Sequence, residues 1–94
     1  MYIVTVDFHV DPNQKHAFIE GMLANAKASL ALEENCVQFD VCLATTDPNH
    51  VFLYEAYRSA QDFQMYLKMP HFQEFNANSA AQVISKVVKT FDLL

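Results

Sequence analysis

The sequence predicts an α+β fold with the element order β-α-β-β-α-β, in which the helices cover one face of a four-stranded antiparallel sheet. Apolar and polar residues alternate near the N-terminus and again in two adjacent segments of the central part of the chain. Between them, apolar residues recur at intervals of three and four, as on one side of a helix. Because 94 residues suffice for one core, we expect a single domain over residues 1–94.

The first strand is expected at residues 2–10, where every second residue is large and apolar. A helix should follow from Pro12 to about Leu32, since proline suits the first helical position and Asp11 before it can serve as the N-cap. Asn35 is expected to end this helix, because asparagine tolerates the left-handed backbone conformation of a helix C-cap.

Two further alternating segments, residues 36–43 and 51–58, are joined by an Asp-Pro-Asn turn and predict a hairpin. Ser59 can cap a second helical segment, which Pro70 should break and restart. A short β-branched segment at residues 86–91 predicts the last strand.

Composition suggests that this domain has a partner. Apolar residues make up 52% of the chain and charged residues 18%, and large apolar residues occur on both faces of the first three predicted strands. A sheet with helices on one side leaves its other face open, so a second sheet should pack there. We therefore expect a homodimer joined through its sheet faces.

Several partners and sites are disfavoured. A net charge of −5 and a pI of about 5.1 oppose nucleic-acid binding, and residues 51–58 lack the basic, glycine-containing motif of RNA-recognition domains. No apolar run is long enough for a membrane span. The four histidines have no metal-ligand spacing, so no metal is expected, and the only glycine, Gly21, lies within a predicted helix and forms no phosphate loop.

Cys36 and Cys42 are expected to be free, buried thiols. Six residues apart on one strand, they would lie roughly 20 Å from each other, which is too far for a disulfide. Free thiols and a first segment without a basic signal region indicate a cytoplasmic protein.

Glu55, His71 and Tyr66 are the candidate catalytic residues, and the sequence leaves open which of them moves the proton. Glu55 shares an otherwise apolar strand face, where a carboxylate can act as a general acid or base, or can be a structural acid paired with Arg58, Lys68 or a helix N-terminus. His71 follows the helix restart, where the helix dipole favours neutral imidazole, although a lone helical histidine is often an ordinary surface residue.

Polar and aromatic residues could complete a binding cavity. Asn25 and Ser29 are four residues apart on the first helix and could face either a cavity or solvent. The aromatic residues could line the cavity or simply form the core, and they are Phe39, Tyr57, Phe63, Tyr66, Phe72 and Phe75.

Four segments, in this order and spacing, resemble the antibiotic-biosynthesis monooxygenase (ABM) family over nearly the whole chain. They are Asn25-Ala26 with Ser29, Glu33-Glu34-Asn35-Cys36 leading into Gln38-Phe39-Asp40-Val41, Leu53-Tyr54-Glu55-Ala56-Tyr57, and Pro70-His71-Phe72 ahead of Phe75. The resemblance implies a ferredoxin-like sandwich, a sheet-to-sheet homodimer forming a dimeric α+β barrel, and a pocket between sheet and helices. It also implies oxygenases of quinol-like aromatics that use neither metal nor flavin.

The chain departs from the family at two aromatic positions. Tyr57 stands where a tryptophan is common, and Tyr66 stands where a histidine is common. Haem-degrading relatives use that tryptophan and that histidine, and this chain has no tryptophan, so haem degradation is disfavoured.

The leading hypothesis is a cofactor-independent monooxygenase of small, electron-rich aromatics. His71 or Glu55 would remove a phenolic proton, and Tyr57, Tyr66 and Asn25 would hold the ring and its oxygens. Ser29, Phe39, Phe72 and Phe75 complete the expected substrate site.

Two other functions remain open. One is an isomerase of a small hydroxy-ketone, similar to the family's phosphorylated autoinducer-2 isomerase, in which Lys27 or Lys68 would meet a phosphate. The other is a ligand-binding module without enzymatic activity, whose pocket would hold no titrating group.

Overall fold

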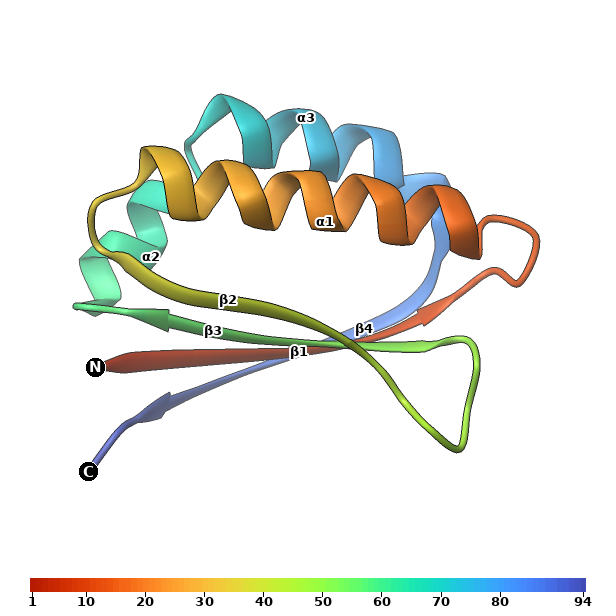
Figure 1. Ribbon diagram of the computed structural model, residues 1–94, viewed down its shortest axis with the longest axis horizontal. Helices are drawn as coiled ribbons and strands as arrows, with labels where there is room; N and C mark the ends of the chain where they lie inside the picture. Colours follow the sequence, from red (N-terminus) through yellow and green to blue (C-terminus); the bar gives the residue numbers. More distant parts are fainter.

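The computed structural model describes residues 1–94 and confirms the predicted α+β order. Its elements are β1 (Tyr2–Val10), α1 (Lys15–Leu32), β2 (Cys36–Leu43), β3 (His50–Tyr57), α2 (Ala60–Tyr66), α3 (Pro70–Ser79), the short 3₁₀ helix η1 (Ala80–Gln82) and β4 (Val83–Asp92). Figure 1 shows the helices as one layer above one sheet. No helix is both long and apolar enough to cross a membrane.

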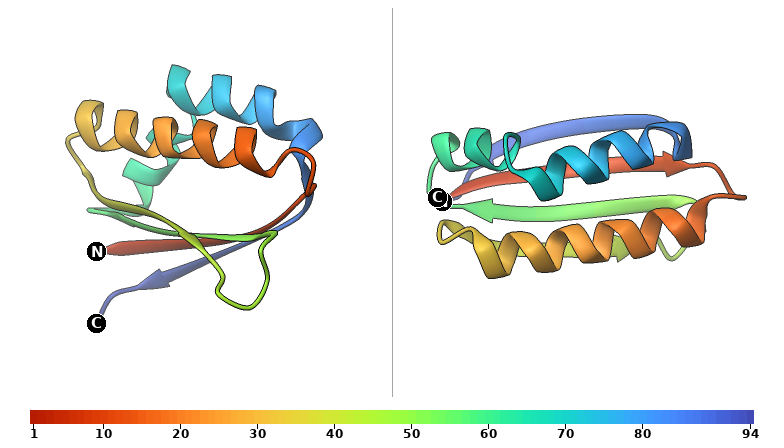
Figure 2. Two further views of the ribbon diagram at one scale, coloured as in Figure 1. Left: turned by 45° about the vertical axis from the view of Figure 1, so that its right-hand side comes forward. Right: turned by 90° about the horizontal axis from the view of Figure 1, so that it is seen from above.

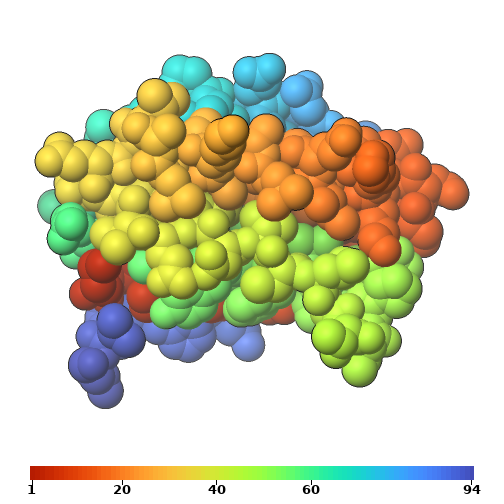
Figure 3. All heavy atoms as spheres, in the orientation of Figure 1, coloured from red at the N-terminus to blue at the C-terminus, as the bar shows by residue number.

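The four strands form one antiparallel sheet in the order β2-β3-β1-β4. Figure 2 shows from two further directions that the helices cover only one face of this sheet. In the space-filling view, α1 and β2 lie side by side on the visible face and the β2–β3 connection projects beyond the sheet (Figure 3). The sheet therefore has one covered face and one open face.

The covered face holds the core, as the alternation in the sequence predicts. Val4 and Val10 are fully buried on β1, and Phe18 and Met22 of α1 pack against this face with at most 1% exposure. Residues at intervals of two on a strand and of three and four on a helix thus meet in one layer.

The other sheet face carries a mixture of apolar and charged side chains. Residues paired across an antiparallel sheet point to the same side. The open face therefore consists of Ile3, Thr5, Asp7, His9, Gln38, Asp40, Cys42, His50, Phe52, Tyr54, Ala56, Ser85, Val87, Lys89 and Phe91. Val87 and Phe91 are 51% and 50% exposed. Nothing within one protomer covers them.

The ends of α1 differ from the prediction. The helix begins at Lys15 rather than Pro12, because Asp11 closes a turn instead: its Oδ1 accepts from the Asn13 backbone N–H and its carbonyl accepts from that of Gln14. Asn35 is not a left-handed cap either, since no residue has a positive φ, and the helix ends at Glu33 in an extended conformation.

The second half of the chain largely follows the prediction. Ser59 caps α2 by accepting from the Asp62 backbone N–H, and Pro70 begins α3 after the expected break. β4 runs from Val83 to Asp92, longer than the predicted 86–91, because it pairs along the whole length of β1.

Both cysteines are free, as predicted, but only Cys36 is buried. The expectation of a buried Cys42 is wrong, because this residue pairs with Phe52 and so lies on the open face.

Candidate active site

A largely apolar cavity of about 560 Å³ lies between the sheet and the α2–α3 segment. Its apolar walls include Val6, Phe8, Leu53, Phe63, Phe72 and Phe75. Two ionisable side chains, Glu55 and Lys86, and the Tyr66 phenol also line it. Apolar walls with a few convergent polar groups are typical of small-molecule sites.

Glu55 is the only carboxylate that lines this cavity. It is 2% exposed at the centre of β3, and Oε1 accepts a 2.7 Å hydrogen bond from the Tyr57 hydroxyl. Burial raises the pKa of Glu55 to about 7, and the Tyr57 hydroxyl opposes part of that rise. The carboxyl group is therefore partly ionised near neutral pH, as a general base requires.

The partner of Glu55 is not one that its sequence surroundings suggested. Arg58, Lys68 and the helix N-termini do not bond to it, whereas Tyr57, two residues along the same strand, does. Burial also raises the pKa of Tyr57 above its ordinary value, so its hydroxyl remains a donor across the neutral range.

Tyr66 contacts the most aromatic rings in the site. Its ring centroid lies 4.9 Å from that of Phe72, 5.8 Å from that of Phe39 and 5.9 Å from that of Tyr57. Its hydroxyl accepts a 2.7 Å hydrogen bond from Asn25 Nδ2 and keeps its own proton to donate, because burial raises its pKa. A substrate oxygen in the cavity could accept that proton's hydrogen bond.

His71 forms a pair with Glu33 outside the cavity. The two side chains are 13% and 7% exposed, and His71 Nε2 lies 2.6 Å from Glu33 Oε2. The Tyr66 ring lies beside the imidazole, with 6.1 Å between the centroids. The short contact with Glu33 orients the imidazole ring next to Tyr66.

Glu33 had no assigned role in the sequence prediction. The available signal was a polar series at intervals of four, Asn25, Ser29 and Glu33, running along the side of α1 that turns inward. All three are buried, and Asn25 Oδ1 and Ser29 Oγ have no hydrogen-bond partner.

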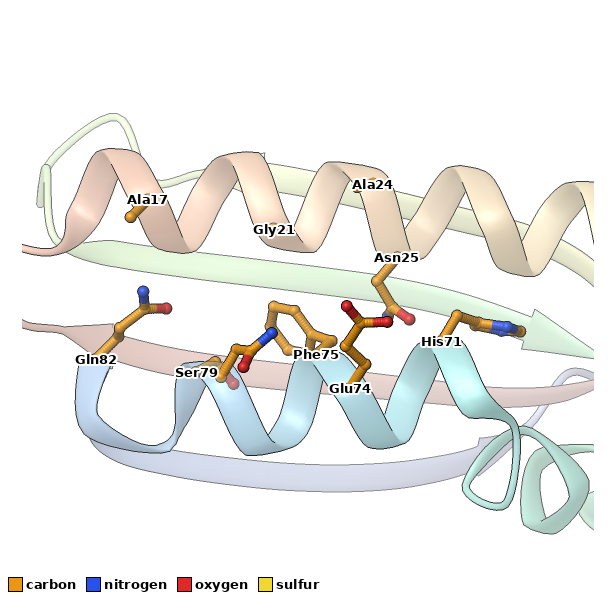
Figure 4. A pocket seen from close by; sticks show the side chains of 10 residues that line it. Ala17, Gly21, Ala24, Asn25, His71, Glu74, Phe75, Ser79 and Gln82 are labelled. Atoms are coloured by element: carbon orange, nitrogen blue, oxygen red, sulfur yellow. The ribbon is translucent and has the colours of Figure 1, made fainter.

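A second hollow, a polar groove of about 370 Å³, separates α1 from α3. Figure 4 shows Asn25 from α1 and Glu74 from α3 reaching into it from opposite sides, with His71 at one end. Phe75 lines both the groove and the cavity. The two candidate bases are thus separated: Glu55 lines the cavity and His71 lines the groove.

The other predicted residues are distributed around these two spaces. Phe72 and Phe75 line the cavity, whereas Phe39, Tyr57 and Ser29 are buried and line neither space. Lys27 and Lys68 are exposed and also line neither. The sequence prediction missed Lys86, whose position on the covered face depends on the pairing of β4 with β1.

A family model described as antibiotic biosynthesis monooxygenase matches residues 1–78. No curated protein matches the chain. A structure from Nitrosomonas europaea, described as a candidate antibiotic biosynthesis monooxygenase, superposes with a TM-score of 0.95 at 24% identity and covers 100% of this chain and 99% of that one.

Two other solved structures have the same fold. An antibiotic biosynthesis monooxygenase superposes with a TM-score of 0.92 at 16% identity, covering 100% of this chain and 99% of that one. Rv0793 from Mycobacterium tuberculosis superposes with a TM-score of 0.90 at 19% identity, covering 99% and 94%. At these identities the likeness establishes the fold.

Proposed function

The chain belongs to the antibiotic biosynthesis monooxygenase family, and we propose that it is a cofactor-independent monooxygenase of small, electron-rich, quinol-like aromatics. One observation carries the proposal: the apolar, aromatic-walled cavity contains a single carboxylate, Glu55, whose pKa is raised to about 7. A group of this kind can remove a phenolic proton at neutral pH.

The cavity suits a one- or two-ring substrate. Its volume of about 560 Å³ lies within the usual range for small-molecule pockets, roughly 300–1,000 Å³. Aromatic walls such as Phe72 and Phe75 can pack against the faces and edges of a substrate ring. A ring packed against these walls displaces water from them, which strengthens hydrogen bonds to a developing anion.

In the proposed first step, Glu55 accepts a proton from a substrate hydroxyl. Because Tyr57 occupies Oε1, the carboxylate offers Oε2 to the substrate. The Tyr66 hydroxyl, oriented by Asn25, donates a hydrogen bond to the phenolate that forms. We assign to His71 and Glu33 the support of Tyr66 from the groove side rather than this proton transfer.

The phenolate then reacts with oxygen without an added reductant. One quinol and one O₂ give one hydroxyquinone and one water: one oxygen atom bonds to a ring carbon, and the other leaves as water. The quinol supplies all the electrons, so the protein contributes deprotonation, orientation and exclusion of water.

The test is oxygen uptake with a panel of naphthoquinols, corrected for autoxidation. We expect protein-dependent uptake that Glu55→Gln lowers by roughly 10²–10⁴-fold, the usual contribution of a general base. Glu20→Gln, an exposed change on α1, should leave uptake unchanged. Absence of protein-dependent uptake, or equal uptake by native protein and Glu55→Gln, would contradict the proposal.

The isomerase alternative uses the same carboxylate to enolise a hydroxy-ketone. One observation favours it: Lys86 lines the cavity and could meet a phosphate, although Lys27 and Lys68 lie outside. Deuterium exchange from a hydroxy-dione without oxygen would distinguish this activity. A binding module without activity is less well supported, because the cavity contains the titrating Glu55.

We also propose a homodimer joined through the open face, located in the cytoplasm. Half-exposed Val87 and Phe91 supply apolar surface, and Lys89 and His9 lie on the same face as Asp7 and Asp40. Such a face can complement itself about a two-fold axis. The free thiols of Cys36 and Cys42 support a reducing compartment.

A further inference from the structure

Lys86 is the only lysine or arginine that lines the catalytic cavity. It lies on β4 opposite Phe8, on the sheet face that the helices cover, and its Nζ stands 5.7 Å from the centre of the Phe8 ring. It forms no ion pair with an acidic side chain. Its ammonium group is exposed and therefore available to a ligand, and its charge also lowers the pKa of Glu55 from a distance.

Lys86 and Glu55 line the cavity from different strands and at different positions along the length of the sheet. Glu55 on β3 is paired with Val4 of β1, and Lys86 on β4 is paired with Phe8. Val4 and Phe8 are four positions apart on β1, which is about 13 Å of strand at roughly 3.3 Å per residue. The long lysine side chain shortens the gap between the charged atoms, and Val6 and Leu53 line the cavity at the level between them.

The cavity thus has a proton acceptor near one end, a cation near the other and apolar walls between them. A simple quinol would use only the proton acceptor and the apolar walls. Because the chain carries a net charge of −5, an anionic ligand is repelled overall and needs a specific cation in its site. Asn76 and Ser79 of α3 line the same cavity and add neutral hydrogen-bonding groups.

We propose that the natural substrate is a hydroxylated ring compound bearing an anionic group, a carboxylate or a phosphate, and that Lys86 binds this group while Glu55 faces the hydroxyl. This inference rests on the proposed function, because it assumes the same cavity and the same base. Lys86 then selects the substrate and fixes which hydroxyl meets Glu55. A charge-assisted hydrogen bond gives such selection.

The alternative is that Lys86 is an ordinary solvated lysine that packs against the Phe8 ring. In that case it would contribute packing but no preference for anions. The two accounts differ in the binding of neutral and anionic ligands of the same shape, so equilibrium binding decides between them.

The probes are 2-naphthol, 6-hydroxy-2-naphthoate and 6-hydroxy-2-naphthyl phosphate, all of which keep a free ring hydroxyl, and their dissociation constants are measured without oxygen. Because the chain contains no tryptophan, naphthol emission is observed free of indole fluorescence. We expect native protein to bind at least one anionic probe about tenfold more tightly than 2-naphthol. The anion that binds more tightly identifies carboxylate or phosphate as the group recognised.

Three variants test whether Lys86 causes that preference. Lys86→Met should abolish it, Lys86→Arg should retain it, and Lys27→Met, a matched change of an exposed lysine outside both hollows, should leave it intact. A native protein that binds all three probes equally, or an anion preference that survives in Lys86→Met, would overturn the inference.

The binding and turnover measurements can contradict the anion site and the oxygenase proposal independently of each other. If oxygen uptake is absent but the Lys86-dependent anion preference is present, the oxygenase proposal fails and the anion site stands. If uptake is present and Glu55-dependent but no anion preference is found, only the anion site fails.

Discussion

The Tyr57 hydroxyl donates a 2.7 Å hydrogen bond to Glu55 Oε1, and the two residues are two positions apart on β3. Residues at this spacing point to the same face of a strand, so a single strand positions both the carboxylate and the donor that tunes it. Burial raises the pKa of Glu55, and the donated hydrogen bond limits the rise. This residue pair therefore sets the pH range over which the Glu55 carboxyl group ionises.

Removing the Tyr57 hydroxyl should move that range upward. Tyr57→Phe deletes a hydrogen bond that favours the ionised carboxylate, so the pKa of Glu55 should rise above its native value of about 7. In the native protein, kcat/KM for the best quinol should increase with pH through about 7, and in the variant this increase should occur at higher pH. An unchanged pH profile would mean that another group acts as the base.

The stability of the protein should fall as the pH rises between about 4.5 and 7. The pKa of Glu55 goes from 4.5 to about 7 on folding, so the folded state binds this proton more tightly than the unfolded chain does. The stabilisation from Glu55 is therefore complete below pH 4.5, the pKa in the unfolded chain, and is lost as the pH rises to about 7, the pKa in the folded protein. The loss is roughly 3 kcal/mol for a pKa shift of this size.

Glu55→Gln should remove this contribution. Glutamine keeps an acceptor for Tyr57 but does not titrate, so the variant should lose less stability than the native protein between pH 5 and pH 8. Urea denaturation of both proteins at the two pH values measures the difference. All other side chains are the same in the two proteins, so their contributions cancel in that comparison. Parallel losses in the two proteins would contradict the assignment.

The buried pair of Glu33 and His71 should contribute to stability as a unit. Glu33→Gln removes one partner of a 2.6 Å contact between nearly buried groups and should cost about 1.5–3 kcal/mol in the free energy of unfolding. Glu34→Gln is its control, because the neighbouring carboxylate is exposed and should change stability by under about 0.5 kcal/mol.

The coupling between the two residues is measured by a double-mutant cycle. Glu33→Gln combined with His71→Ala should cost less than the sum of the single changes, since each single change already breaks the contact. Additive costs in urea denaturation would show that the two side chains do not support each other.

Charge placed on the open face should dissociate the dimer. Val87→Asp puts a carboxylate on half-exposed apolar surface of β4, where burial against a second sheet would leave it unpaired. Analytical ultracentrifugation at low micromolar concentration should show native protein at twice 10.7 kDa and the variant at 10.7 kDa. Leu30→Asp, on the exposed side of α1, should remain dimeric. A native monomer would refute the proposed assembly.

Local patterns in the sequence were sufficient to predict the order of the strands and helices and which face of each is buried. Alternation placed Glu55 on the buried side of its strand, and the cap at Ser59 and the restart at Pro70 depend on bonds within a few residues. The prediction that α1 begins at Pro12 was wrong for a similarly local reason, because Asp11 and Pro12 can form a turn as well as begin a helix.

The composition of the site was decided by the tertiary structure. The pairing of His71 with Glu33, the placement of Glu55 and His71 in different spaces, and the position of Lys86 beside Phe8 join residues far apart in the chain. Periodicity shows which way a side chain points relative to its own element, but not which element faces it. That depends on strand register and on how α1 and α3 pack over the sheet, because these contacts form only when the core is assembled.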